Sequence, residues 1–172
     1  MEVVVVPHDP AWFAKFSSEA IRLSRALGAT AIAIHHIGST SIAGIYAKPV
    51  VDILLEVKSI EDADASREVI AYLGYEVLGE FGISGRRYYR KNTQNGAREF
   101  HVHAFATGSV HLDRHIALRD FMRAHGHFAA AYSDLKRHLA RVHPNSMDDY
   151  MDGKDAFIKD MERRALQWWR PE

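Results

Sequence analysis

Residues 35–57 read HHIGSTSIAGIYAKPVVDILLEV, and this stretch contains two predicted strands around which the rest of the chain can be arranged. The first strand is expected over Ile32 to Ile37 and the second over Val50 to Val57. On the second strand the apolar residues alternate from Val51 onward, which indicates the side that faces the core. Asp52 lies on the other side. A carboxylate this close to an apolar run is costly unless it is hydrogen-bonded, ion-paired or metal-bound.

The small residues between these strands predict a turn that approaches a ligand closely. Gly38 permits close backbone approach, and Ser39 and Thr40 add amides and hydroxyls of the kind that hold a phosphate. Lys48 would be a nearby cation for the same anion. The plainer alternative is an ordinary loop, with Asp52 paired to Lys48 or to an arginine.

Working outward, hydrophobic spacing and turn residues predict the remaining elements. Asp9-Pro10 is typical of a helix start, Gly28 of a helix stop, and Asn95-Gly96 of a hairpin turn. The other expected elements are strands at Val3 to Val6 and Tyr75 to Leu78, a helix at Glu61 to Leu73, a hairpin of Arg86 to Lys91 with Arg98 to Phe105, and helices at His111 to His125, Phe128 to Val142 and Asp148 to Trp168.

This order predicts a mixed α/β half followed by a helical tail. Two strands joined by a short loop and then a hairpin favour a mixed or largely antiparallel sheet, since a doubly wound parallel sheet alternates strand and helix more strictly. No linker or repeat interrupts the 172 residues, so we expect residues 1–172 to form one domain.

The amino-acid composition limits the kinds of partner and metal site that we expect for this chain. The 22 basic and 22 acidic residues cancel, which argues against nucleic acid or an anionic membrane as a general partner. The chain has no cysteine, so disulfides and thiolate metal sites are excluded. The first ten residues resemble neither a secretory signal nor a membrane span, and we expect a cytoplasmic location. The oligomeric state is left open.

A second polar cluster is predicted on the strand Arg98 to Phe105. Alternation places Glu99, His101 and His103 on one face, with same-face neighbours about 6.6 Å apart, so two imidazoles can converge on one metal ion or phosphate. Arg86, Tyr88 and Arg90 on the partner strand would stand beside them. A solvated polar face explains the same pattern nearly as well.

Several charged residues of the helical tail repeat at intervals along the helices. Arg119, Lys136 and Lys154 are among them. Spacing alone favours a solvated face or pairs of opposite charge one turn apart, not a site.

Taken together, these segments resemble the GrpB family, whose hallmark stretch reads His-Ile-Gly-Ser-Thr, then Pro-Gly, Ala-Lys-Pro and Ile-Asp-Ile. The corresponding stretch is His35 to Val57, and the similarity continues through Leu73-Gly74-Tyr75, His101-x-His103, residues 118–123 and Tyr150-x-x-Gly153-Lys154. The family's Pro-Gly is replaced by Ala43-Gly44. The resemblance covers nearly the whole chain.

The resemblance implies a nucleotidyltransferase-like fold, with a mixed sheet flanked by helices, and a phosphate-containing small-molecule ligand such as a nucleotide. It implies that Gly38, Ser39 and Thr40 hold phosphate and that carboxylates two residues apart bind metal. Here Leu54 stands where the second carboxylate belongs. A set of Asp52, His101 and His103, completed by Glu99, would suit Zn²⁺ or Mn²⁺ better than Mg²⁺.

Three functions therefore remain open. The first is metal-assisted nucleotidyl or phosphoryl transfer, with Asp52, His101 and His103 as catalytic residues. The second is a non-catalytic module that binds a nucleotide or another anion, which the missing carboxylate favours. The third is a metal-dependent hydrolase built on the same three residues. In each, the expected anion-binding residues are Gly38, Ser39, Thr40, Lys48, Arg86, Arg87, Arg119, Lys136 and Lys154.

Overall fold

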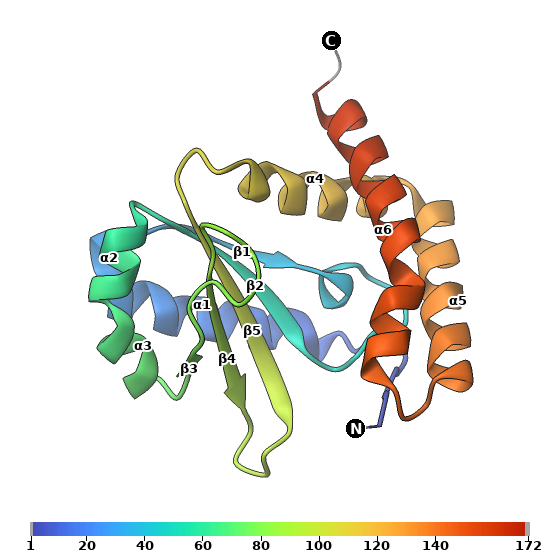
Figure 1. The fold of residues 1–172 in the computed structure, drawn as a ribbon, viewed down its shortest axis with the longest axis horizontal. Helices are drawn as coiled ribbons and strands as arrows, with labels where there is room; N and C mark the ends of the chain where they lie inside the picture. Colours follow the sequence, from blue (N-terminus) through green and yellow to red (C-terminus); the bar gives the residue numbers. More distant parts are fainter. Residues whose placement is uncertain (1, 171–172) are drawn as a thin grey trace.

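The computed structural model describes residues 2–170, in which a five-stranded mixed sheet has the order β1-β2-β5-β4-β3 (Figure 1). The strands are β1 (Ala31–Ile37), β2 (Val51–Val57), β3 (Glu76–Val77), β4 (Arg87–Asn92) and β5 (Arg98–Ala106). The helices are α1 (Ala11–Leu27), α2 (Ile60–Ala65), α3 (Arg67–Tyr72), α4 (Val110–Ala124), α5 (Gly126–Val142) and α6 (Met147–Trp169). The expected mixed α/β fold with a helical tail is confirmed.

The register of the sheet brings the two predicted polar clusters together. Strand β1 runs antiparallel to β2, whereas β2 and β5 are parallel, with Asp52 opposite His101 and Leu54 opposite His103. The hairpin of β4 and β5 then places Tyr88 opposite His103. Because paired residues point to the same face, the carboxylate and both imidazoles share one side of the sheet.

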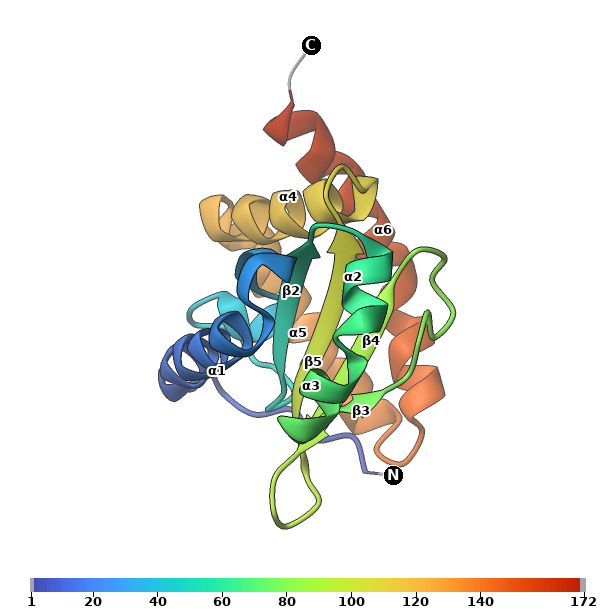
Figure 2. The same cartoon turned by 90° about the vertical axis from the view of Figure 1, so that its left-hand side faces the viewer.

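One face of the sheet packs on α1, α2 and α3, which lie together on one side in Figure 2. The alternating residues of β2 from Val51 and of β5 from Phe100 meet Leu23 of α1 and Ile70 of α3. All four are 5% exposed or less. This is the core face that the alternation predicted.

The opposite face is closed by the helical tail. Leu54 and Phe105 are fully buried with Leu112 of α4. A separate apolar cluster joins α4, α5 and α6 to Ile42 and Ile45 of the loop after β1. Figure 1 shows α5 and α6 side by side at one end of the sheet, with α4 crossing the end of the strands. Asp52 therefore lies between the sheet and the tail.

Two predicted elements differ from the structure. Val3 to Val6 forms no strand beyond a single bridge from Val6 to Ala47. The helix expected over Glu61 to Leu73 is divided into α2 and α3 at Ser66, whose hydroxyl donates to the Asp62 carbonyl at 2.9 Å. Serine competes with the helical backbone in this way, which explains the break.

The expected face of Glu99 is also wrong. Arg98 pairs with Asn92 and Phe100 pairs with Lys91, so β5 has one residue more than β4 at this point, and that residue is Glu99. Such a bulge turns the side chain away from the strand's regular alternation. The carboxylate lies 3.4 Å from Lys15 of α1, on the opposite side of the sheet from Asp52.

None of the helices within residues 2–170 combines the length and apolar character needed to cross a membrane.

Candidate functional site

A cavity of about 500 Å³ opens between the sheet and the tail, with Asp52 in its wall. Ten residues singled out from the sequence line it: Gly38, Ser39, Thr40, Lys48, Asp52, Arg86, His101, His103, Lys136 and Lys154. They come from the β1–β2 loop, β2, the residue before β4, β5, α5 and α6. The structure thus brings together residues up to 116 positions apart in the sequence, from Gly38 to Lys154.

The turn after β1 is built for close contact with Asp52. Gly38 has φ 69° and ψ −173°, a conformation that only glycine adopts readily. A Cβ atom at this position would lie 2.7 Å from Asp52 Oδ2. The next residues form a 3₁₀ turn over Ser39–Ser41, in which the Thr40 hydroxyl lies 2.9 Å from His36 Nε2. The Gly38 backbone thus lies close to the Asp52 carboxylate, and the contact between Thr40 and His36 helps to fix the turn.

Asp52 belongs to a chain of polar contacts that ends at Arg86. Arg86 donates from a terminal nitrogen to His103 Nδ1 at 3.3 Å, and His103 Nε2 lies 3.3 Å from Asp52 Oδ1. Since guanidinium only donates, His103 Nδ1 must accept, and Nε2 carries the proton given to Asp52. Arg86 is itself fixed by the carbonyls of Glu80 and Phe81.

The Asp52 carboxyl is held in its charged form. Burial by itself raises its pKa, but the hydrogen bonds that the rings of His101 and His103 donate to the charged carboxylate outweigh that effect. The resulting pKa lies well below the usual range of a carboxyl. His101 Nδ1 approaches Asp52 Oδ1 at 3.3 Å, like His103, and the side chain of Asp52 remains 29% exposed to the cavity.

Three lysines line the same cavity as Asp52. Lys136 and Lys154 are 2% and 9% exposed, and burial lowers their pKa values to about 7 and about 8. Burial also lowers the pKa of Lys48. Lys136 donates to the Tyr46 carbonyl, and Lys48 contacts Met147 Sδ at 3.7 Å. Within residues 2–170 none of the three forms an ion pair with a carboxylate, so their charge is poorly compensated.

Two tyrosines that sequence reasoning did not assign to the site stand beneath these lysines. The ammonium of Lys136 lies 4.3 Å from the ring centre of Tyr132, and that of Lys154 lies 4.6 Å from that of Tyr150. The Tyr-x-x-x-Lys spacing that both pairs share could have indicated that each tyrosine lies beside its lysine, because residues one helical turn apart lie on one face. The Tyr150 hydroxyl is buried without a partner among the residues that the structure describes.

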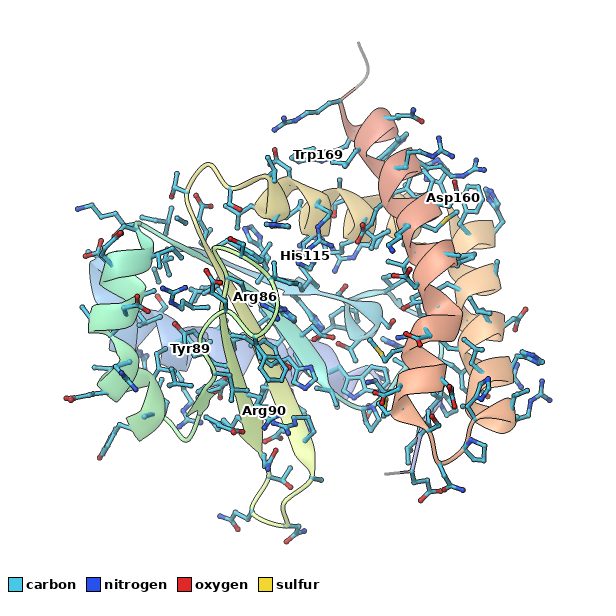
Figure 3. All side chains as sticks on the ribbon, in the orientation of Figure 1. Arg86, Tyr89, Arg90, His115, Asp160 and Trp169 are labelled. Atoms are coloured by element: carbon cyan, nitrogen blue, oxygen red, sulfur yellow. The ribbon has the colours of Figure 1, made fainter. Side chains whose placement is uncertain are left out.

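His115 of α4 was also missed. Its ring lies 5.6 Å from that of His103, below α4 in Figure 3. Burial and the charge of Arg114 lower the pKa of His115 to about 3, so the ring is neutral near pH 7. No sequence spacing marked this histidine, since it reaches the site only through the packing of α4.

Two expected arginines lie away from the cavity. Arg87 ion-pairs with Asp64 of α2 at 2.6 Å, and Arg90 with Glu76 of β3 at 2.5 Å. Arg87 follows Arg86 on an extended chain, so its side chain points to the opposite face. The expectation that Arg87 faces the same anion as Arg86 is not met by this geometry.

Arg119 lies beside the site. It lines a smaller cavity of about 200 Å³ that adjoins the first. Its guanidinium contacts Asp120 at 2.7 Å and the His36 carbonyl at 3.3 Å. Arg119 therefore ties α4 to β1 as well as bordering the smaller cavity.

The side chains as arranged do not fit a metal centre. The second carboxylate of a two-magnesium site is replaced by the buried Leu54. His103 Nε2 bears a proton, so it has no lone pair for a metal, and Glu99 lies on the other face. In residues 2–170 no group of three or more His, Asp or Glu side chains is placed to hold an ion.

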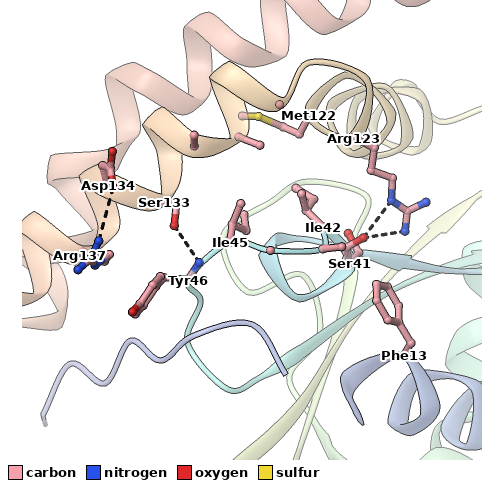
Figure 4. Close-up of a pocket in the computed structure, with 15 residues that line it drawn as sticks. Phe13, Ser41, Ile42, Ile45, Tyr46, Met122, Arg123, Ser133, Asp134 and Arg137 are labelled. Atoms are coloured by element: carbon pink, nitrogen blue, oxygen red, sulfur yellow. Dashed lines mark hydrogen bonds and ion pairs between the residues drawn. The ribbon is translucent and has the colours of Figure 1, made fainter. Parts of the chain in front are cut away.

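A larger cavity, about 780 Å³, lies on the other side of the loop that follows the 3₁₀ turn at Ser39–Ser41 (Figure 4). Its polar groups are already engaged. Arg123 donates twice to the Ser41 carbonyl, at 2.9 and 2.8 Å, and the Ser133 hydroxyl accepts from the Tyr46 amide at 2.8 Å. These contacts fix the loop against α4 and α5, and they leave the smaller Asp52 cavity as the better candidate site.

The sheet, the Gly-Ser turn and the following aspartate define a nucleotidyltransferase-like fold. A structure of Cid1 in complex with the UTP analog UMPNPP superimposes with a TM-score of 0.54 and 12% identity, covering 86% of this chain and 48% of Cid1. At that identity the similarity establishes the fold alone.

The chain belongs to the GrpB family: the family model described as GrpB protein matches residues 2–164. It is 42% identical to UPF0157 protein YqkA of Bacillus subtilis over 97% of the chain, and it spans about half (48%) of that relative's length. The crystal structure of conserved protein GrpB from Enterococcus faecalis superimposes with a TM-score of 0.91 at 41% identity, covering 97% of this chain and all of that one.

Proposed function

We propose that the chain binds the phosphates of a nucleotide or a similar phosphorylated small molecule in the cavity beside Asp52. The observation that carries the proposal is the imbalance of charge in the cavity wall. Lys48, Arg86, Lys136 and Lys154 line it, and Asp52 is the one acidic residue among the described lining residues. Buried cations are costly without an anion, so a polyphosphate would stabilise this arrangement.

The polar groups around the cations support the same ligand. The Gly38-Ser39 turn presents backbone and hydroxyl groups, and the unpartnered Tyr150 hydroxyl can donate to a phosphate oxygen. The Cid1 structures of the same fold include complexes described as bound to MgGTP and MgATP. These complexes are a property of Cid1, and they motivate the choice of nucleotides as the first ligands to test.

The test is a thermal-shift titration followed by calorimetry, with inorganic tripolyphosphate and the four nucleoside triphosphates. Each is measured with EDTA and with Mg²⁺, Mn²⁺ or Zn²⁺. A ligand at 100 times its dissociation constant stabilises the folded state by about 2.7 kcal/mol, which raises the Tm of a chain of this size by roughly 5–10 °C.

Two variants separate a specific site from general charge. Lys154→Met should weaken binding at least tenfold, because it removes one buried cation from the cavity. Lys159→Met is the matched control on the same helix, since Lys159 is exposed and pairs with Asp155 at 2.6 Å. Equal loss in the two variants, or no shift with any ligand, would contradict the proposal.

A second candidate function, transfer of the bound nucleotidyl or phosphoryl group, is favoured by the charged Asp52 at the cavity wall. Here Asp52 would accept a hydrogen bond from an acceptor hydroxyl and orient it toward phosphorus. The new oxygen–phosphorus bond would form as the bond to the departing phosphate breaks, and the hydroxyl proton would be released to solvent. Asp52→Asn should then abolish turnover and keep binding. Product formation by that variant at the wild-type rate would reject this second function.

A further inference from the structure

We propose that the 200 Å³ cavity next to the phosphate site receives the nucleobase of the ligand, so that the ligand is a mononucleotide whose two ends lie in different chemical surroundings. This inference rests on the proposed function. The larger cavity with the three lysines is called the lysine lobe, and the smaller one beneath α4 and α6 the apolar lobe.

The two lobes meet at Asp52. Five residues line both of them: Gly38, Ser39, Asp52, His103 and Tyr132. A molecule with its phosphates in the lysine lobe can therefore extend past Asp52 into the apolar lobe. The part of the nucleotide that joins the base to the phosphates would then lie nearest Asp52.

The lining of the apolar lobe suits a compact ring. Leu118 of α4, Ile158 of α6 and Ile42 of the loop supply apolar walls, and no lysine lines this lobe among the described residues. A volume of 200 Å³ holds a nucleobase but not a polymer chain. Phosphate would lose its hydration here and meet one cation, Arg119, which is already paired with Asp120, so the phosphates favour the lysine lobe and the base the apolar lobe.

Polar groups at the border of the lobe favour a base over an alkyl chain. Arg119, His115 and the Ser39 hydroxyl line it together with the apolar residues. An alkyl group would cover these donors and acceptors without pairing them, which is unfavourable. A nucleobase has an apolar face and a polar edge, and it can meet both kinds of surface.

The experiment compares tripolyphosphate with ATP, GTP, CTP and UTP by calorimetry, on the wild-type chain and on Leu118→Phe, which fills the apolar lobe. We expect at least one nucleotide to bind wild type ten or more times more tightly than tripolyphosphate. In Leu118→Phe that advantage should disappear, while tripolyphosphate affinity stays within about twofold. Leu166→Phe is the matched control, since Leu166 of α6 is 37% exposed and outside the lobe.

The outcomes are distinguishable. If no ligand binds the wild-type chain, the proposed function fails and this inference with it. If tripolyphosphate and all four nucleotides bind equally, the phosphate site stands and the apolar lobe is rejected as a base site. Equal weakening of both ligand classes by Leu118→Phe also rejects it. Should that variant lose its cooperative melt, Ile158→Phe is measured in its place.

Discussion

Gly38→Ala should destabilise the chain by about 2–6 kcal/mol, because two separate costs coincide at this residue. A side chain at φ 69° and ψ −173° costs about 1–3 kcal/mol in backbone strain. The new Cβ would also lie 2.7 Å from Asp52 Oδ2 and 3.1 Å from Asp52 Cβ, and such overpacking costs about 1–3 kcal/mol. The Tm should fall by roughly 4–24 °C.

The control is Gly44→Ala in the same loop. Gly44 also has a positive φ, of 82°, but no atom lies within 4 Å of the added Cβ. Only the strain remains, about 1–2 kcal/mol. Urea denaturation of both variants gives the difference, and combining Gly38→Ala with Asp52→Ala should recover the part of the loss that comes from the contact.

The reasoning would be refuted if Gly38→Ala were no less stable than Gly44→Ala, or if removing the Asp52 side chain recovered nothing. A destabilised Gly38→Ala that still binds tripolyphosphate with wild-type affinity would show instead that the turn is structural and unconnected with the ligand.

Three further predictions concern the helical tail. In Gly153→Ala the new Cβ would lie 2.5 Å from Leu139 Cδ2, so urea melts should show a loss of about 1–3 kcal/mol, whereas Gly126→Ala, with open space, should be neutral or slightly stabilising. Lys136, whose pKa burial lowers to about 7, binds fewer protons in the folded than in the unfolded chain above that pH. Lys136 should therefore make stability rise from pH 7 toward 10, by at most about 1.4 kcal/mol per unit, with a further rise from Lys154, whose pKa burial lowers to about 8. Lys136→Met should reduce the combined slope, and an unchanged slope would exclude Lys136 as a source of it. Tyr150→Phe should keep or slightly raise the Tm and weaken tripolyphosphate binding in calorimetry, since it removes a buried hydroxyl that lacks a protein partner; unaltered binding would place that hydroxyl outside the site.

Most of the fold follows from local patterns. Alternation identified the core faces of β2 and β5, and Gly28 and Asn95-Gly96 marked a helix end and a hairpin turn. Local sequence patterns could not predict the bulge at Glu99, because this extra residue depends on how β5 is paired with β4. The division of the second helix depends similarly on one serine hydroxyl.

The candidate site likewise contains residues that local sequence patterns could place and residues that only tertiary packing places. Alternation alone placed His101 and His103 on one face of their strand and Asp52 on the polar face of another, but only the pairing of β2 with β5 brings the carboxylate to the imidazoles. Lys136 and Lys154, in contrast, look like ordinary surface charges in the sequence, and only the docking of α5 and α6 buries them. Arg86 and Arg87 are adjacent in sequence and alike in type, yet strand geometry sends one to His103 and the other to Asp64.

The parallel pairing of β2 with β5 has a consequence for how the protein assembles. Neither strand can meet the other until the roughly 40 residues between them have folded back, and the ammonium groups of Lys136 and Lys154 arrive only with α5 and α6. The proposed binding of an anion therefore requires α5 and α6 to be docked, and a bound ligand would stabilise the contact of these helices with the sheet. Amide protons in α5 and α6 should then exchange more slowly when ligand is bound, even though most of them lie far from it.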